Sequence, residues 1–148
     1  MQEDFRDVIV ELLTADARFL VVGAHALSAY GVPRATVDLD LWIDTSAENA
    51  ARVYQALTRF GAPMQAMGIT EGDLTSKDQI IQLGVPPNRI DLLTGISGVT
   101  FAEAWPDHLM APFDGILAPH IGREAFIKNK RATGRHKDLG DLASLGTP

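Results

Sequence analysis

The sequence contains no cysteine, which excludes disulfide bonds and thiolate metal ligands. Long apolar runs are also missing: a run such as Phe19–Val22 is far too short to cross a bilayer. The first residues, Met-Gln-Glu-Asp-Phe-Arg, lack the basic-then-apolar layout of a signal peptide. These absences predict a cytoplasmic protein without a membrane segment.

Basic residues are scarce, with 13 Lys and Arg against 19 Asp and Glu and a formal net charge of −6. This balance argues against a general nucleic-acid binder, because affinity for phosphate depends on Lys and Arg. The basic residues are also unevenly placed. Residues 123–137 contain six of the 13 and one acid, Glu124. Such a cluster suggests a site for a small polyanion, although a solvated helix face is the alternative.

What is present is the composition of a globular protein. The 148 residues are 46% hydrophobic and 22% charged, which predicts one domain over residues 1–148. Periodicity and turn residues predict helices at 3–15, 25–30, 47–60, 101–107, 123–133 and 137–145. They predict strands at 19–23, 37–44, 79–85 and 89–94, with an edge strand at 116–119. Residues 63–78 are expected to be loop with a short helical turn. This order favours an α/β (α+β) fold, a mixed sheet flanked by helices.

The strand at 37–44 carries the most informative pattern, Asp-Leu-Asp-Leu-Trp-Ile. Alternate residues of a strand face the same way, so Asp38 and Asp40 share the face opposite Leu39, Leu41 and Ile43. The Cα atoms of the two aspartates would lie ~6.5–7 Å apart. Neighbouring carboxylates repel each other unless a cation or a proton lies between them. Oxygen ligands without nearby His or Cys favour Mg²⁺ or Mn²⁺; a solvent-facing strand edge is the alternative.

The strand at 89–94 carries a third acid, Asp91, on the face opposite Ile90 and Leu92. If this strand neighbours the first, the three carboxylates can hold two metal ions, one gripping a triphosphate and one activating the attacking oxygen. Asp91 would then lie nearest the acceptor and help to deprotonate its hydroxyl. Upstream, Gly23 ends a strand and opens a short helix, where backbone can approach a phosphate closely.

Together, these residues resemble the nucleotidyltransferase superfamily with the DNA polymerase β-like catalytic core. The pattern is a Gly turn on a short helix, an Asp-x-Asp pair on the next strand and an acid on a later strand. More closely, Val-Val-Gly-Ala-His-Ala-Leu-Ser and Thr-Val-Asp-Leu-Asp-Leu-Trp-Ile resemble small bacterial nucleotidyltransferases related to AbiEii-type toxins and to antibiotic nucleotidyltransferases. The resemblance spans residues 19–145 and implies the single-domain nucleotidyltransferase fold, with Asp38, Asp40 and Asp91 as catalytic and metal-binding residues.

The resemblance also implies a nucleotide-binding set: Gly23, Ala24, Ser28, Arg34, Thr36, Lys128 and Lys137. Ala24 departs from the pattern, because many active members have Ser at this position to hold a phosphate. Ser28, one turn later, is a possible substitute. His25 either lines the same pocket or is a buried core residue, and Trp42 either stacks on an acceptor or packs under a helix. Each cation could equally be an ordinary surface charge.

The expected activity is transfer of an NMP from an NTP, such as ATP, to an acceptor hydroxyl, with Mg²⁺ or Mn²⁺ as cofactor. The acceptor could be RNA (a tRNA 3′ end), a protein or a small molecule, and a toxin–antitoxin component fits the resemblance. A homodimer or partner protein is expected to complete the site. The alternatives are a non-catalytic relative that binds a nucleotide or a partner, which Ala24 favours, and a metal-dependent phosphohydrolase.

Overall fold

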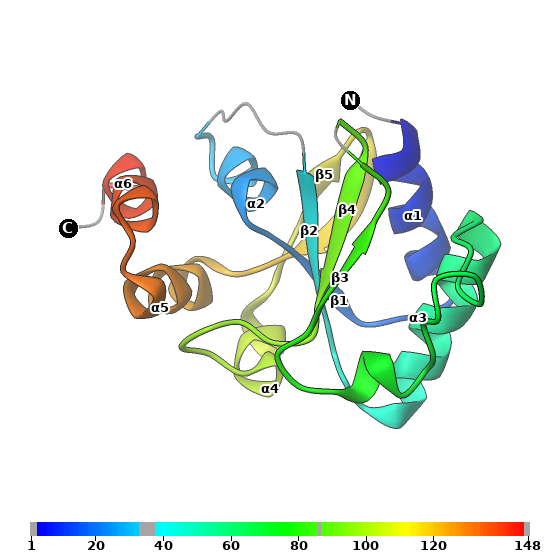
Figure 1. Ribbon diagram of the computed structural model, residues 1–148. Helices are drawn as coiled ribbons and strands as arrows, with labels where there is room; N and C mark the ends of the chain where they lie inside the picture. The colour runs from blue at the N-terminus through cyan, green and yellow to red at the C-terminus, as the bar shows by residue number, and fades with distance from the viewer. Residues whose placement is uncertain (1–2, 33–37, 86, 147–148) are drawn as a thin grey trace.

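The computed structural model describes residues 3–32, 38–85 and 87–146 (Figure 1). Its strands are β1 (Phe19–Val22), β2 (Asp38–Ile43), β3 (Ile80–Leu83), β4 (Arg89–Leu93), β5 (Leu109–Phe113) and β6 (Ile116–His120). Its α-helices are α1 (Glu3–Thr14), α2 (Ala24–Ala29), α3 (Ala47–Phe60), α4 (Phe101–Ala104), α5 (Arg123–Thr133) and α6 (His136–Ser144). Two 3₁₀ turns, η1 (Asp73–Thr75) and η2 (Trp105–Asp107), complete the elements.

The strands form a six-stranded sheet in the order β3-β4-β2-β1-β6-β5. Two pairs are parallel, β2 with β4 and β1 with β6, and the other neighbours are antiparallel. The sheet is therefore mixed, as the sequence predicts, and β3 and β4 form an antiparallel hairpin. The central parallel pair places residues from distant parts of the sequence side by side.

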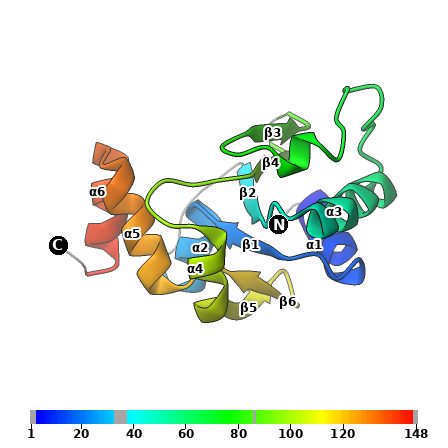
Figure 2. The same cartoon turned by 90° about the horizontal axis from the view of Figure 1, so that it is seen from below.

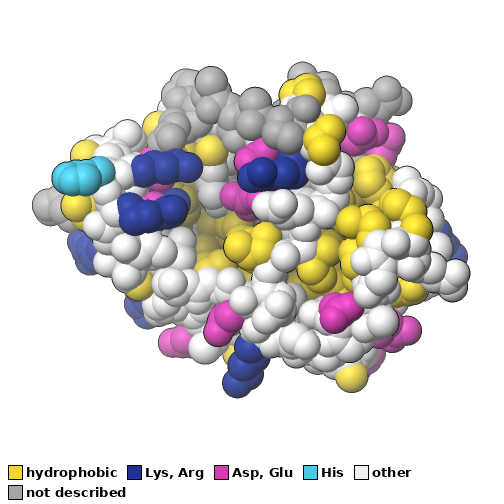
Figure 3. All heavy atoms as spheres, in the orientation of Figure 1, with side chains coloured by type: hydrophobic (Ala, Val, Ile, Leu, Met, Phe, Trp, Pro, Cys, Tyr) yellow, Lys and Arg dark blue, Asp and Glu magenta, His cyan; other side chains and the backbone are white. Residues whose placement is uncertain are grey.

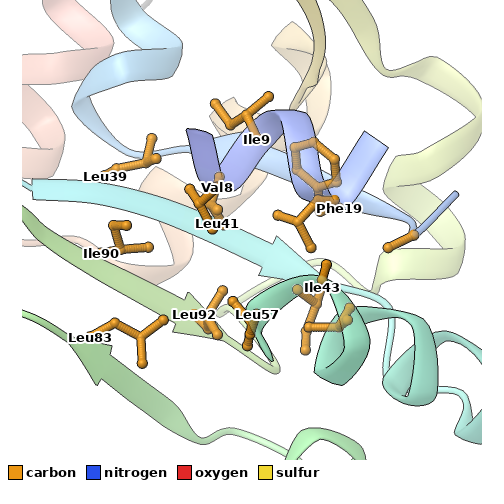
Figure 4. Close-up of a cluster of buried hydrophobic side chains, with 14 of the residues drawn as sticks. Val8, Ile9, Phe19, Leu39, Leu41, Ile43, Leu57, Leu83, Ile90 and Leu92 are labelled. Carbon is orange, nitrogen blue, oxygen red and sulfur yellow. The ribbon is translucent and has the colours of Figure 1, made fainter. Parts of the chain in front are cut away.

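Helices cover both faces of this sheet. Helices α1 and α3 lie on one face and α2, α4 and α5 on the other (Figures 1 and 2). The first face packs on a core that includes Val8, Ile9, Phe19, Leu39, Leu41, Ile43, Leu57, Ile90 and Leu92 (Figure 4). The second face packs on a smaller cluster that includes Leu20, Leu27, Trp42 and Phe126. The alternation predicted for β2 and β4 is therefore correct, and their aspartates point away from the larger core.

Helix α3 shows how local sequence sets the element ends. The Ser46 side chain accepts a hydrogen bond from the Asn49 backbone N–H at 3.2 Å, which caps the first turn. Gly61 ends the helix in the left-handed conformation, at φ 102°, where a residue with a Cβ would be strained. These two residues fix where α3 begins and ends, and the helix begins just past the end of β2 that is away from Asp38.

One strand prediction was wrong. Residues 116–119 were expected at the edge, but β6 lies between β1 and β5, and β5 is the edge strand. Strand β5 was missed because Leu-Met-Ala-Pro-Phe contains Pro112 and shows no simple alternation of buried and exposed residues. Proline is tolerated in an edge strand, where one row of N–H groups has no strand partner.

Within the part of the chain that the structure describes, no helix is both long and apolar enough to span a membrane.

Candidate active site

The parallel pairing of β2 with β4 brings the predicted acidic residues together. In this register Asp38 lies beside Arg89 and Asp40 lies beside Asp91. Because residues two apart on a strand share a face, all four side chains lie on the side of the sheet that faces α2 and α5. The sequence supplies the pair on β2, and the fold adds Asp91 together with a basic residue that the prediction did not include.

Arg89 is bound into this carboxylate cluster. Its Nη2 donates to Asp38 Oδ2 at 2.7 Å and to Asp91 Oδ2 at 3.3 Å. Its Nε lies 3.3 Å from Asp91 Oδ1. The cluster thus has three carboxylates and one guanidinium, so it keeps an excess of negative charge when all four groups are ionised.

The excess charge is reflected in two pKa values. Burial, together with the nearby Asp91 and Asp38 carboxylates, raises the pKa of Asp40 from 3.8 to about 6, against the opposing effect of Lys137 and Arg89. Burial also raises the pKa of Asp91, and Arg89 partly offsets this effect. Two neighbouring acids with raised pKa values favour a shared proton or a bound cation.

Gly23 lies directly against Asp40. Its backbone adopts φ 69° and ψ −150° at the start of α2, and a Cβ added to it would come within 2.6 Å of Asp40 Oδ2. Glycine is therefore required at position 23 for two reasons: the positive φ and the absence of a side chain. The predicted Gly turn lies next to the acidic pair, as the sequence interpretation proposed.

Gly23 and Asp40 form part of the wall of an open cavity of about 540 Å³. The opposite wall comes from the end of α5 and the start of α6, with Asn129, Lys130 and Arg135. Figure 3 shows Lys and Arg side chains on the α5–α6 side of this hollow and acidic side chains across it. A cavity with one acidic and one basic wall can take a polyphosphate whose charge is shared between metal and protein.

The basic residues of this wall have different roles. Lys130 is buried, and its Nζ lies 3.3 Å from Asp138 Oδ1 and 3.4 Å from Asp141 Oδ2, an ion pair that ties α5 to α6. Arg135 donates from Nε to Asp138 Oδ2 at 2.7 Å, and its hydrogen bonds hold the pKa of Asp138 well below its usual range. These contacts hold the helix junction in place, while Lys137 remains exposed.

The two favoured lysines are placed differently. Lys137 is close enough to lower the pKa of Asp40, so the fold brings it to the acidic cluster. Lys128 is exposed and does not line the cavity; its charge acts on Glu103 at the start of α4. Lys130, two positions after Lys128, lines the cavity instead.

The other residues predicted to contact phosphate do not line the cavity or lie outside the described residues. Ala24 and Ser28 do not line the cavity, and Ser28 is exposed. Arg34 and Thr36 lie outside the described residues. The site as described therefore depends on Gly23 and the acidic cluster, and the Ser28 substitute for the missing serine lacks structural support.

For two aromatic residues the packing alternative holds. The His25 ring lies between Phe5 and Phe113, with centroid distances of 5.7 and 5.3 Å. Burial lowers the pKa of His25. Trp42 is 1% exposed and packs edge-on against Phe101 at 5.2 Å. Both rings therefore pack against other aromatic side chains.

The donor set fits a hard divalent cation. Asp40 and Asp91 offer adjacent carboxylates whose pKa values are raised by burial, and Asp91 Oδ1 is buried without a hydrogen bond within the described part of the chain. Oxygen ligands of this kind suit Mg²⁺ or Mn²⁺. However, no three acidic or histidine side chains among the described residues are already arranged to hold an ion. Arg89, which contacts two of the three aspartates, is the group that a cation would meet.

The fold is a mixed sheet flanked by helices, and a solved protein structure shares it. The chain superposes on a crystal structure of TM1012 from Thermotoga maritima, a proposed nucleotidyltransferase, with a TM-score of 0.58. The two sequences are 12% identical, and the match covers 96% of this chain and 88% of TM1012. At this identity the likeness establishes the fold alone. No protein-family model and no curated protein matches the sequence.

Proposed function

We propose that this protein is a divalent-metal-dependent nucleotidyltransferase that moves an NMP from an NTP to an acceptor hydroxyl. The observation that carries the proposal is the in-register pairing of Asp40 with Asp91, against Gly23, at a cavity of about 540 Å³. An acidic pair at this position of a nucleotidyltransferase fold supports nucleotide transfer. It supports simple nucleotide binding less directly.

The residues divide the chemistry between them. A bound Mg²⁺ or Mn²⁺, held by Asp38, Asp40 and Asp91, would neutralise the triphosphate and activate the attacking oxygen. The acceptor oxygen forms a bond to the α-phosphorus, the bond to the β-phosphate oxygen breaks, and pyrophosphate leaves. Asp91, the acid proposed to lie nearest the acceptor, accepts the hydroxyl proton. Lys137 offsets the negative charge that develops on the phosphates.

The acceptor belongs to one of three classes: RNA such as a tRNA 3′ end, a protein hydroxyl, or a small molecule. A toxin of a toxin–antitoxin pair would use the first or the second class. The negative net charge of −6 disfavours unaided binding of long RNA. A partner chain or a second copy would then supply part of the acceptor site.

The test incubates the protein with each NTP, labelled at the α-phosphate, in Mg²⁺ with total RNA, total protein or a panel of small aminoglycosides. We expect label on one acceptor class, with release of pyrophosphate. The Asp40→Asn variant should transfer nothing. The matched control is Asp44→Asn, because Asp44 lies just past the other end of β2, where it bonds to Ser46.

Three outcomes decide between the candidate functions. Label that is transferred by wild type and lost only in Asp40→Asn supports the proposal. Mg²⁺-dependent NTP binding with no label on any acceptor identifies a non-catalytic relative, which the Ala24 departure favours. Release of free nucleotide or phosphate without an acceptor identifies a phosphohydrolase.

A further inference from the structure

Arg89 is a basic side chain that contacts the acidic cluster directly. Lys137 acts on the cluster at longer range. Arg89 lies at the start of β4, beside Asp38 on β2 and two positions before Asp91. Its guanidinium therefore lies on the sheet, beside the acidic cluster, and Arg89 is not part of the basic wall that α5 and α6 form at the cavity.

The contacts of Arg89 use the oxygens that a metal would need. Nη2 binds Asp38 Oδ2 at 2.7 Å, and the guanidinium approaches both oxygens of Asp91 at 3.3 Å. A guanidinium and a divalent cation both bind carboxylate oxygens, and one lone pair cannot serve both at full strength. A cation that enters the cluster must therefore share or replace these contacts.

The ion pair is also placed so that it can open. The side chains of Arg89 and Asp38 are 30% and 26% exposed, so the guanidinium can leave Asp38 for solvent. Asp91 is only 11% exposed, so its carboxylate would then need another positive charge, which a divalent cation can supply. The ion pair between Lys130 and Asp138 contrasts with the Arg89 pair, because those side chains are 10% and 0% exposed. The bridge between Arg89 and Asp38 is therefore more exposed than the bridge that ties α5 to α6.

We propose that Arg89 is a displaceable counter-ion that competes with a divalent cation for Asp38 and Asp91 and so sets the affinity of the metal site. This inference rests on the metal dependence of the proposed function. Arg89 is thus a positioning residue: it holds the carboxylates together, and metal loading requires it to give up at least one contact.

The experiment measures binding of Mn²⁺ by electron paramagnetic resonance and of Mg²⁺ by calorimetry, in the absence of nucleotide. Arg89→Gln removes the charge but keeps a side chain of similar reach. We expect it to bind the metal about 10- to 100-fold more tightly, the effect of one charge within a few ångströms of the ligands. Arg89→Lys keeps the charge and should stay near wild type.

Arg52→Gln is the matched control. Arg52 is also ion-paired, to Glu48 at 2.8 Å, but it lies on α3 on the opposite side of the sheet. Its loss should leave metal affinity unchanged. Unchanged or weaker metal binding by Arg89→Gln would overturn the inference, because it would mean that Arg89 assists the metal site or does not affect it.

A second measurement uses the wild-type protein, in case Arg89→Gln does not fold. The Nε–H signal of Arg89 is followed by ¹⁵N nuclear magnetic resonance as Mg²⁺ is added. Displacement predicts that this signal shifts or broadens together with the carboxyl signals of Asp38 and Asp91, while the Arg52 signal stays constant. Carboxyl signals that move while the Arg89 signal does not would also overturn the inference.

Failure of this inference is distinguishable from failure of the proposed function. If the metal affinity does not change in the Arg89 variants, the counter-ion role is refuted and the proposed nucleotidyl transfer is not affected. A wild-type protein that binds neither Mg²⁺ nor Mn²⁺ removes both. Transfer that is absent while the Arg89 effect is present removes only the assigned reaction.

Discussion

Replacing Asp40 by Asn should stabilise the protein at neutral pH when metal is removed. Burial and two neighbouring carboxylates raise the pKa of Asp40 to about 6 from 3.8. A shift of two units corresponds to roughly 3 kcal/mol of unfolding free energy. Solvent around the partly exposed cluster screens part of this energy, so we expect a gain of about 1–3 kcal/mol.

The sign of the pH dependence follows from proton binding. Between pH 4 and pH 6 the folded protein holds a proton on Asp40 that the unfolded chain has largely lost. The contribution of Asp40 therefore makes the folded state less stable as pH rises through this window and is constant above it. The Asn variant lacks this loss, so its advantage should be largest at pH 7.5 and should nearly vanish at pH 4.

The assay is urea unfolding in EDTA, followed by circular dichroism at pH 4, 5, 6 and 7.5. Asp44→Asn serves as the control, because Asp44 lies just past the end of β2 that is away from the cluster. An Asp40→Asn variant that is equally stable or less stable than wild type at pH 7.5 would refute the electrostatic reasoning. Added Mg²⁺ should stabilise wild type and not the variant, since binding to the folded state raises its stability.

Two further predictions concern the cavity. Gly23→Ala should abolish nucleotide binding, measured by calorimetry, because its Cβ would lie 2.6 Å from Asp40 Oδ2. Gly31→Ala is the control, because Gly31 also has a positive φ, 80°, but has open space around it. It has the same backbone cost of about 1 kcal/mol without the clash, so it should bind nucleotide normally. Lys137→Gln should weaken NTP binding by about 1.5–3 kcal/mol, the value of a hydrogen bond to a charged group, and should leave thermal stability unchanged. Lys128→Gln should bind the NTP like wild type. Equal effects of the two lysine variants would contradict the placement of Lys137 beside the acidic cluster.

The arrangement of the acidic residues could be predicted only in part from the sequence. Alternation along β2 is local, so it places Asp38 and Asp40 on one face without further information. Asp91 also has the correct face, but nothing local to β4 says which strand it pairs with. Its position beside Asp40 depends on the parallel pairing of β2 with β4, and the sequence interpretation took that from the family order.

Arg89 was missed although the necessary signal was present. It stands two positions before Asp91, so the rule that placed Asp91 on the site face places Arg89 there as well. What the sequence could not show is that its guanidinium reaches across to Asp38, since that contact needs the register between the two strands. Pairing registers of distant strands follow from the whole fold.

The basic segment shows the opposite limitation. Its composition predicted a cation cluster, but Lys128 and Lys130, two positions apart on α5, point to different surroundings. Lys130 is buried because Asp138 and Asp141 on α6 meet it, and helical periodicity on α5 alone gives no information on a neighbouring helix. Strand β5 was missed for a related reason. Pro112 is acceptable in a strand only where no further strand pairs with it, and the sequence of β5 alone does not show that β5 lies at the edge of the sheet.

The pairing of β2 with β4 also has a consequence for how the chain folds. Arg89 and Asp38 are 51 positions apart, whereas β1 and β2 are joined through the short helix α2. Contacts between distant segments carry a larger loop-closure entropy and tend to form late. The three carboxylates therefore come together only when β4 docks beside β2, so their repulsion opposes one of the late steps of assembly. Arg89 arrives on the same strand as Asp91, and the chain thus delivers a compensating charge at the moment the repulsion begins.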